Sequence, residues 1–295
     1  KVLRLRLLMG SFSILHEFLY KFDYIPKQES DINDSLINLY GSHLLALYAA
    51  LKPIYDGKDY AVKPALPFLL WPKNNGNDWT NADLKVMIYG RETNGWDNPD
   101  SRERKMKPNW ALNNSDDVRK EIDAIQNIYD GYFNFTTKQE QDNRFFNLGL
   151  YPIVESIKLA LPSIKVSYLW NEISKIGNGY NIHKDKVSCG KPKTYIHDIE
   201  MKHFNVSQGE IDILKPDVII FLAGKDATPY ILEKFNIITS HAPSLEFPEI
   251  SEITISNVKY VLKTNFNHPS RGLSKETRDK NYLEIVRRIK QQFGL

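Results

Sequence analysis

The run KPDVIIFLAG at Lys215–Gly224 carries the strongest strand signal in the chain. Its centre, Val218–Ala223, is an unbroken apolar stretch rich in β-branched residues, and a glycine follows it. Strands that are apolar on both faces occur mainly in parallel sheets that helices cover on both sides. This stretch therefore predicts a buried parallel strand of an α/β protein.

Three other runs predict further strands of the same sheet. They are Leu84–Gly90, Lys165–Asn171 and Val258–Thr264, and each is short and rich in apolar, β-branched or aromatic residues. A shorter strand is expected at Glu252–Ile255.

Helical patterns lie between these strands. Pro152 predicts a kink or a break in one of them, and the Gly- and Asn-rich run Ile176–Asn181 predicts a loop. The alternation of strands and helices predicts a three-layer α/β/α sandwich with a mainly parallel, four-stranded central sheet. The predicted helical segments are Asp116–Tyr132, Gln139–Leu161, Tyr195–Leu214, Asp226–Phe235 and Ser274–Phe293.

The sequence pattern divides the chain into three parts. Apolar helical runs at Leu3–Tyr20 and Ile32–Leu51 predict a helical N-terminal extension over residues 1–60. Residues 61–83 are rich in Pro, Asn, Gly and Trp, which predicts an irregular connection. The α/β domain is expected to cover residues 84–295.

The composition is that of a globular protein without a membrane span. The 295 residues are 42% hydrophobic and 25% charged, which provides enough apolar material for a sizeable core. The longest apolar stretches, such as Leu44–Leu51, are far shorter than the roughly 20 residues of a transmembrane helix. No small-residue cleavage site follows the basic, leucine-rich stretch Lys1–Phe12. We therefore expect neither a signal peptide nor a membrane partner.

A single cysteine, Cys189, limits the chemistry and the compartment. It excludes an internal disulfide, and it supplies too few thiolates for a structural zinc site or an iron–sulfur cluster. His183, His197, His203 and His241 show no metal-ligand spacing. We expect a cytoplasmic location, no metal and no other cofactor.

The distribution of charge is more informative than its sum. The net charge of +3 is too small to indicate a nucleic-acid partner by itself. Between Lys259 and Leu295 there are nine Lys or Arg residues and three Asp or Glu residues, so this tail carries +6 and the rest of the chain −3. The asymmetry permits a phosphate-binding surface, and a solvated helix face is the alternative. Nothing in the sequence determines the oligomeric state.

Polar residues follow each predicted strand. The runs are GRETN at 90–94, NE at 171–172, GKD at 224–226 and NHPS at 267–270. Because ligands of parallel α/β sheets bind outside the carboxyl ends of the strands, these runs are the candidate site.

The order of these runs resembles the uracil-DNA glycosylase superfamily. Its members carry a glycine followed by a catalytic acid or amide after the first strand, and a His-Pro-Ser-type motif after the last. GRETN at 90–94 and HPS at 268–270 occupy these places, and Asn171 matches the asparagine that often ends the family's second strand. Lys215–Gly224 also resembles the family's third strand. The resemblance covers roughly residues 84–295 and rests on short motifs in order.

The resemblance implies a site made of Glu92, Asn171 and His268. Glu92 is the predicted carboxylate that activates water, and His268 is the predicted donor to the departing base, so these two are the predicted catalytic residues. The amide of Asn171 is predicted to bind the polar edge of a flipped base. The other predicted base-binding residues are Asn94 and Trp96, the latter by stacking, and the predicted nucleic-acid-binding residues are Arg91, Ser270, Arg271 and Leu273.

Three departures from the uracil-excising members bear on this assignment. Glu92 stands in place of an Asp and is one methylene longer, and near-attack geometry tolerates little displacement. Asn94 replaces the Tyr that closes the pocket against thymine. The usual Pro-Leu after the last motif becomes Arg271-Gly272-Leu273, so either Leu273 or Arg271 is the candidate wedge into the duplex. The departures affect water activation and base discrimination.

The sequence therefore predicts a DNA base-excising hydrolase that cleaves the N-glycosidic bond of a flipped base. The alternative is a catalytically inactive nucleic-acid or nucleotide binding protein on the same fold. A different small-molecule hydrolase or transferase is a third interpretation, but the chain has no Walker loop, dinucleotide fingerprint or nucleophile elbow. Structural roles also remain open: a surface ion pair for Glu92, a turn cap for Asn171, backbone bonding for His268 and packing for Trp96.

Overall fold

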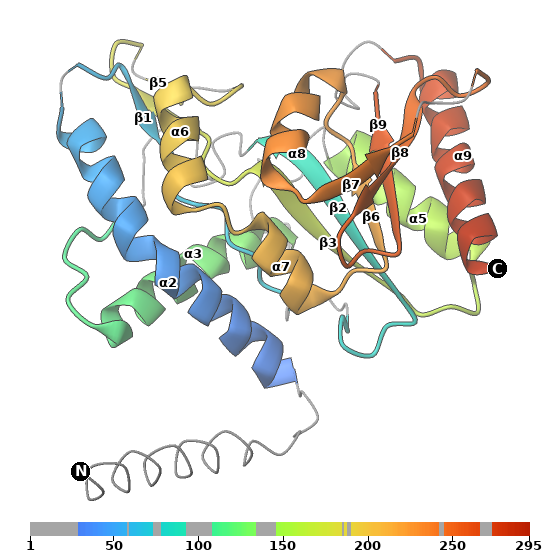
Figure 1. The fold of residues 1–295 in the computed structure, drawn as a ribbon, viewed down its shortest axis with the longest axis horizontal. Coiled ribbons are helices and arrows are strands. Elements are labelled where there is room, and N and C mark those ends of the chain that lie inside the picture. The colour runs from blue at the N-terminus through green and yellow to red at the C-terminus, as the bar shows by residue number, and fades with distance from the viewer. Residues whose placement is uncertain are drawn as a thin grey trace, which may run out of the picture.

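A six-stranded sheet forms the centre of the protein, with the strand order β3-β2-β6-β9-β8-β7 (Figure 1). The structure is a computed structural model that describes residues 29–57, 59–72, 78–92, 108–133, 146–184, 186–187, 190–241, 245–265 and 273–295. β3, β2, β6 and β9 pair in parallel, and β8 and β7 extend the sheet in antiparallel pairing. The strands are β2 Leu84–Glu92, β3 Val166–Ser174, β6 Val218–Phe221, β7 Ile237–Ser240, β8 Ile250–Ile255 and β9 Tyr260–Thr264.

The protein is thus α/β, as predicted, but its main sheet is mixed and six-stranded where the sequence predicts a mainly parallel, four-stranded one. The expected strand at Glu252–Ile255 is confirmed as β8. β7 has no counterpart in the prediction because it is a short edge strand whose last three residues are exposed. An exposed strand lacks the apolar run or alternation by which strands are identified in a sequence.

A second sheet has three strands, in the order β1-β4-β5. Its strands are β1 Val62–Pro64, β4 Asn178–Asn181 and β5 Lys186–Val187. The loop predicted at Ile176–Asn181 is therefore wrong for its last four residues, which form β4 and pair with β1 from the predicted irregular connection. The pairing depends on Gly179, since a Cβ there would lie 2.8 Å from the carbonyl oxygen of Pro64.

The predicted helices of the α/β domain are confirmed, with altered bounds. They form α3 Ser115–Phe133, α5 Tyr151–Ala160, α6 Thr194–His203, α7 Ser207–Leu214, α8 Thr228–Lys234 and α9 Lys275–Phe293. The break expected near Pro152 is a change of helix type, because the π-helical turn Phe146–Leu150 leads directly into α5. Residues Lys225–Ala227 form a 3-10 turn before α8.

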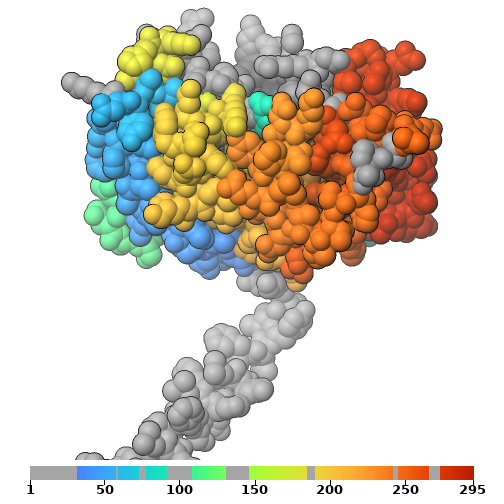
Figure 2. All heavy atoms as spheres, turned by 45° about the horizontal axis from the view of Figure 1, so that its top comes forward, coloured from blue at the N-terminus to red at the C-terminus, as the bar shows by residue number. Residues whose placement is uncertain are grey.

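The helix assigned to the N-terminal extension packs into the core of the α/β domain. This helix, α2 Glu29–Asp56, contacts α3, α6 and α7. In the space-filling view α6 lies between α2 and the α7–α8 region (Figure 2). Leu36, Tyr40 and Leu44 of α2 are 0% exposed and belong to the same apolar cluster as the strands. Residues 1–28 lie outside the described part of the chain.

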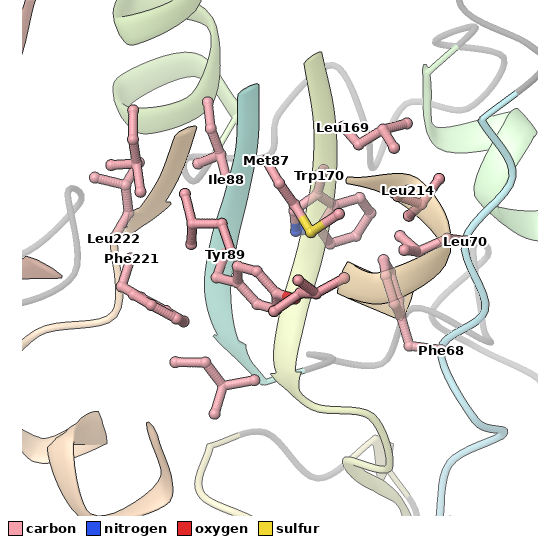
Figure 3. Close-up of a cluster of buried hydrophobic side chains, with 14 of the residues drawn as sticks. Phe68, Leu70, Met87, Ile88, Tyr89, Leu169, Trp170, Leu214, Phe221 and Leu222 are labelled. Atoms are coloured by element: carbon pink, nitrogen blue, oxygen red, sulfur yellow. The ribbon is translucent and has the colours of Figure 1, made fainter. Parts of the chain in front are cut away.

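Aliphatic and aromatic side chains pack together around β2 and β3 (Figure 3). The ring centroids of Tyr89 and Phe221, on neighbouring strands, are 4.9 Å apart. Those of Phe68 and Trp170 are 4.7 Å apart and join the segment after β1 to the sheet. Edge and offset contacts of this kind add to the free energy gained from burial.

No helix among the described residues is both long enough and apolar enough to cross a membrane.

Neighbouring leucines of α2 offer a test of whether this helix belongs to the core. Leu44→Ala is expected to lower the free energy of unfolding by about 2–5 kcal/mol, because it opens a cavity in a fully buried site. Leu45 is 51% exposed, so Leu45→Ala is expected to change it by less than about 1 kcal/mol. Urea denaturation of both variants checks this. Equal effects, or a separate transition for α2, would show that the helix is an appendage.

Candidate functional site

The carboxyl ends of the parallel strands bring two of the polar runs side by side. In the β2–β3 register Tyr89 is the partner of Asn171 and Gly90 is the partner of Glu172. β6 pairs with the other side of β2, with Phe221 opposite Tyr89. The first and second polar runs therefore meet at one edge of the sheet, as expected for parallel strands.

The structure places four of the nine predicted site residues. Glu92 is the last residue of β2, in register with Ser174. Arg91 precedes it and is partly buried, and Leu273 is partly buried against the core. Asn171 is 0% exposed. The others lie outside the described residues, so their convergence with Asn171 stays a prediction: Asn94, Trp96, His268, Ser270 and Arg271.

Both ends of the Asn171 amide are engaged inside the protein. Nδ2 donates to Oε2 of Glu210 at 3.0 Å and contacts the sulfur of Met87 at 3.4 Å. Oδ1 accepts from the backbone N–H of Glu172 at 2.7 Å and from the ammonium of Lys175. To bind a base, the amide would first have to release some of these partners.

Lys175 and Glu210 form a fully buried ion pair beside Asn171. The ammonium lies 2.8 Å and 2.7 Å from the two oxygens of Glu210, and both side chains are 0% exposed. The hydroxyl of Tyr40, from α2, donates to Oε1 of Glu210 at 2.8 Å. The pair therefore joins the end of β3 to helices α7 and α2.

A second buried pair, Lys234 and Glu200, holds the backbone just after β3. One oxygen of Glu200 accepts from the backbone N–H of Lys175 at 2.7 Å, and the other from that of Ile176 at 3.1 Å. Lys234 binds Glu200 and donates to the carbonyl oxygen of Ile173 at 2.7 Å. We call this set the buried polar network, and its members are Tyr40, Asn171, Lys175, Glu200, Glu210 and Lys234.

The charges in the buried polar network balance, with two ammonium groups and two carboxylates at 0% exposure. Burial lowers the pKa of Lys175, and the charge of Glu210 acts in the opposite direction. Burial raises the pKa values of Tyr40 and Tyr89 well above the usual range of a tyrosine, and the negative charge of Glu210 adds a smaller effect in the same direction. Both hydroxyls therefore stay protonated at neutral pH, as the donation from Tyr40 to Glu210 requires.

Glu172 lies on the other face of β3 from Asn171, because successive strand side chains alternate. Its Oε1 accepts from the indole N–H of Trp170 at 2.9 Å, and the residue is 4% exposed. Its carboxylate lies directly over Gly90, where a Cβ would be 2.5 Å from Oε2 and 2.7 Å from Oε1. Since real Cβ contacts are not that short, any other residue at position 90 would displace the Glu172 carboxylate from this position.

Sequence reasoning missed most of these residues. Glu172 stands beside Asn171 at a predicted strand end, but no motif assigns it a role. Lys175, Glu200, Glu210 and Lys234 are spread over 60 residues of chain, and charged residues at helical positions usually indicate a solvated face. No sequence signal distinguishes them. No group of three or more His, Cys, Asp or Glu side chains in the described residues is arranged to hold a metal ion.

No protein-family model and no curated protein matches this chain. The resemblance to uracil-DNA glycosylases is therefore carried by the motif order alone.

The arrangement provides a carboxylate in a low-polarity, water-poor site at the carboxyl edge of the sheet. Glu172 lies against aromatic rings, since Trp170 packs 4.7 Å from both Phe68 and Phe146, measured between ring centroids. Glu172 is thus a buried carboxylate that accepts from Trp170 and lies over Gly90 at this edge of the sheet.

Removing one charge of the Lys175–Glu210 pair is expected to lower the free energy of unfolding far more than removing both charges. Lys175→Met leaves Glu210 buried without its cation, which is expected to lower the free energy of unfolding by about 3–5 kcal/mol. The double variant Lys175→Met/Glu210→Gln keeps an acceptor for Tyr40 and is expected to recover most of that loss. Urea denaturation measures both changes.

The control for this comparison is Lys52→Met. Lys52 pairs with Asp56 on the surface, with side chains 50% and 60% exposed, so the expected change is below about 1 kcal/mol. If Lys175→Met is no worse than Lys52→Met, the buried pair does not hold the end of β3.

Proposed function

We propose that the protein is a DNA base-excising hydrolase whose site lies at the carboxyl ends of β2 and β3. The observation that carries the proposal is the buried carboxylate of Glu172 over Gly90. Gly90 opens the run that resembles the family's first motif, and Glu92 ends the same strand. A glycosylase needs carboxylate chemistry at this place.

The strand order supports the same location. β2 lies between β3 and β6, and β9 lies next to β6. β2 ends at Glu92 and β9 ends at Thr264, at the same edge of the sheet. The segment that contains Asn94 follows the first of these ends, and the segment that contains His268 follows the second. The four strands to which the motif order assigns these runs are neighbours in the sheet and run parallel, which supports the proposal.

The finer architecture is part of the proposal. α5 and α8 both contact β3, and α9 contacts β9. Helices of this kind are expected to cover the two faces of the parallel strands and so complete a three-layer α/β/α sandwich. Such a protein would act on DNA in the cytoplasmic compartment, without metal or redox cofactor.

Two carboxylates suit the reaction. Cleavage of an N-glycosidic bond passes through a sugar with cationic character, which a carboxylate stabilises while it activates the attacking water. Glu92 is the proposed water-activating residue, and His268 is the proposed donor to the departing base. A water-poor surround strengthens each of these interactions.

A second candidate is a nucleic-acid or nucleotide binding protein without hydrolysis. The engagement of Asn171 favours it, because that amide is already bonded to Glu210, Lys175 and Met87. If Asn171 does not bind the base, the family's mode of base recognition is lost and hydrolysis does not follow from the resemblance.

An oligonucleotide cleavage assay tests the proposed function. Oligonucleotides that each contain one uracil, mismatched or alkylated base are incubated with the protein, and abasic sites are revealed by alkaline strand scission. We expect product from at least one of them, and a rate at least about a hundredfold lower for Glu92→Gln, because a positioned general base contributes about that much. Glu155→Gln, at a side chain 64% exposed on α5, is the control.

The same assay decides between the two candidates. Absence of abasic product from every oligonucleotide would contradict hydrolysis. If the protein then binds DNA with an affinity that falls steeply with salt, the binding function remains.

A further inference from the structure

A basic segment follows the carboxyl end of β3. The run HKDKVSCGKPK at 183–193 holds four lysines and one aspartate, so it carries a net charge of +3. β3 ends at Ser174, and β4 begins a few residues later at Asn178. We call residues 178–193, which include β4 and β5, the basic hairpin. No motif assigns this part of the chain a function.

Asparagine side chains hold the backbone of the basic hairpin. Asn178 is buried, and its Nδ2 donates to the carbonyl oxygen of Lys191 at 2.9 Å. Its Oδ1 accepts from the backbone N–H of Lys193 at 3.0 Å. At the turn between the strands, Oδ1 of Asn181 accepts from the backbone N–H of His183 at 3.0 Å. The lysines of the hairpin therefore extend from a backbone with a defined position.

The cations of the basic hairpin are accessible. Lys184, Lys191 and Lys193 are exposed, and none of them forms an ion pair within the part of the chain that the structure describes. Pro192, between the last two, is buried. Lys193 has extended backbone, with φ −61° and ψ 145°, and a residue before proline favours extended backbone too.

Extended backbone places alternate side chains on the same side, about 7 Å apart. Lys191 and Lys193 therefore point to the solvent together, while Pro192 packs against the protein. A DNA strand carries one negative charge for each nucleotide along its backbone. A pair of neighbouring cations on one side of a fixed segment suits such a row of charges.

The basic hairpin lies next to the proposed site. Nζ of Lys191 is 5.1 Å from the ring centroid of Tyr230, in the first turn of α8. α8 follows the carboxyl end of β6, and the exposed Lys225 stands in the turn between them. β5 and the first turn of α6 lie at the same end of the molecule as the first turn of α8 (Figure 1). Cations therefore flank the carboxyl ends of β3 and β6, the two neighbours of β2.

The C-terminal tail, where the sequence permits a phosphate-binding surface, uses much of its positive charge within the protein. Lys259 lies 2.6 Å from a carboxylate oxygen of Asp217. Arg287 and Arg288 both bind Glu284, at 2.7 Å each. These cations are already paired, so they attract phosphates less than the lysines of the basic hairpin do.

We propose that the basic hairpin binds the phosphate backbone of the DNA strand that enters the site, through Lys184, Lys191 and Lys193. The inference rests on the proposed function for the identity of the polyanion, because exposed lysines also attract anionic lipids. The position beside the carboxyl ends of the strands favours DNA. The inference names the surface that holds the substrate outside the site itself.

The salt dependence of binding tests the inference apart from hydrolysis. The probe is a single-stranded thymidine oligonucleotide of about 16 nucleotides, the longest stretch that one single-strand-binding module usually covers. Fluorescence anisotropy gives its dissociation constant at several salt concentrations. Each phosphate contact contributes about 0.7 to the slope of log K against log salt concentration on a single strand.

The hairpin variant, Lys184→Gln/Lys191→Gln/Lys193→Gln, is expected to bind the probe about tenfold or more weakly at low salt and to reduce the salt slope by about 2, because three phosphate contacts are lost. A control variant removes the same charge from three exposed lysines elsewhere, and it is expected to keep the wild-type slope. It is Lys158→Gln/Lys165→Gln/Lys259→Gln.

A footprint of the wild-type protein needs no variant to fold. Lysines are acetylated with an N-hydroxysuccinimide ester in the presence and absence of the oligonucleotide, and the modified peptides are measured by mass spectrometry. Lys184, Lys191 and Lys193 are expected to be protected. Lys165 and Lys259 are expected to react equally in both samples.

The outcomes separate the inference from the proposed hydrolysis. Equal salt slopes of the two triple variants, unprotected hairpin lysines, or no binding by the wild-type protein overturns the inference. Binding to phosphatidylserine vesicles that the hairpin variant loses, while it keeps its affinity for DNA, also overturns it. Loss of DNA binding in the hairpin variant alone, without abasic product from any oligonucleotide, supports the inference and contradicts hydrolysis. Cleavage together with equal salt slopes keeps the hydrolysis and overturns the inference.

Discussion

The buried ion pair between Lys175 and Glu210 is the interaction on which the rest of the candidate site depends. Two charges at 0% exposure lose their hydration, and only close mutual contact and additional hydrogen bonds offset that loss. Asn171 and Tyr40 provide those bonds. Glu200 and Lys234 form a second buried ion pair, which bonds the backbone just after β3. The end of β3 is therefore bonded to helices α2, α6, α7 and α8, and small displacements of it break several buried contacts at once.

The pleat of β3 sends Asn171 and Glu172 to opposite faces of the sheet. Asn171 points towards the buried polar network, and its amide is bonded to Glu210 there. Glu172 points the other way and lies over Gly90. A shift of one residue along the strand would exchange these two roles. The residue that most resembles a base-binding asparagine in the sequence thus has both ends of its amide bonded inside the protein.

The sequence predicts those parts of the fold that have a local pattern. Val218–Ala223 is buried on both faces, so its strand is visible as an apolar run. β4 at Asn178–Asn181 contains no such run and exists through pairing with β1, more than 100 residues earlier in the chain. The site divides in the same way. Gly90 and Glu172 stand at predicted strand ends, whereas the pairing of Lys175 with Glu210 depends on the tertiary contact between the end of β3 and α7 and leaves no mark in the sequence.

A crystal structure of the protein with a single-stranded oligonucleotide that carries a non-cleavable 2′-fluoroarabino nucleotide tests the central claim most directly. The account predicts that the base lies at the carboxyl ends of β2 and β3, and that the bond of Asn171 to Glu210 stays intact. A base bound elsewhere, or held by an Asn171 amide released from Glu210, would contradict it.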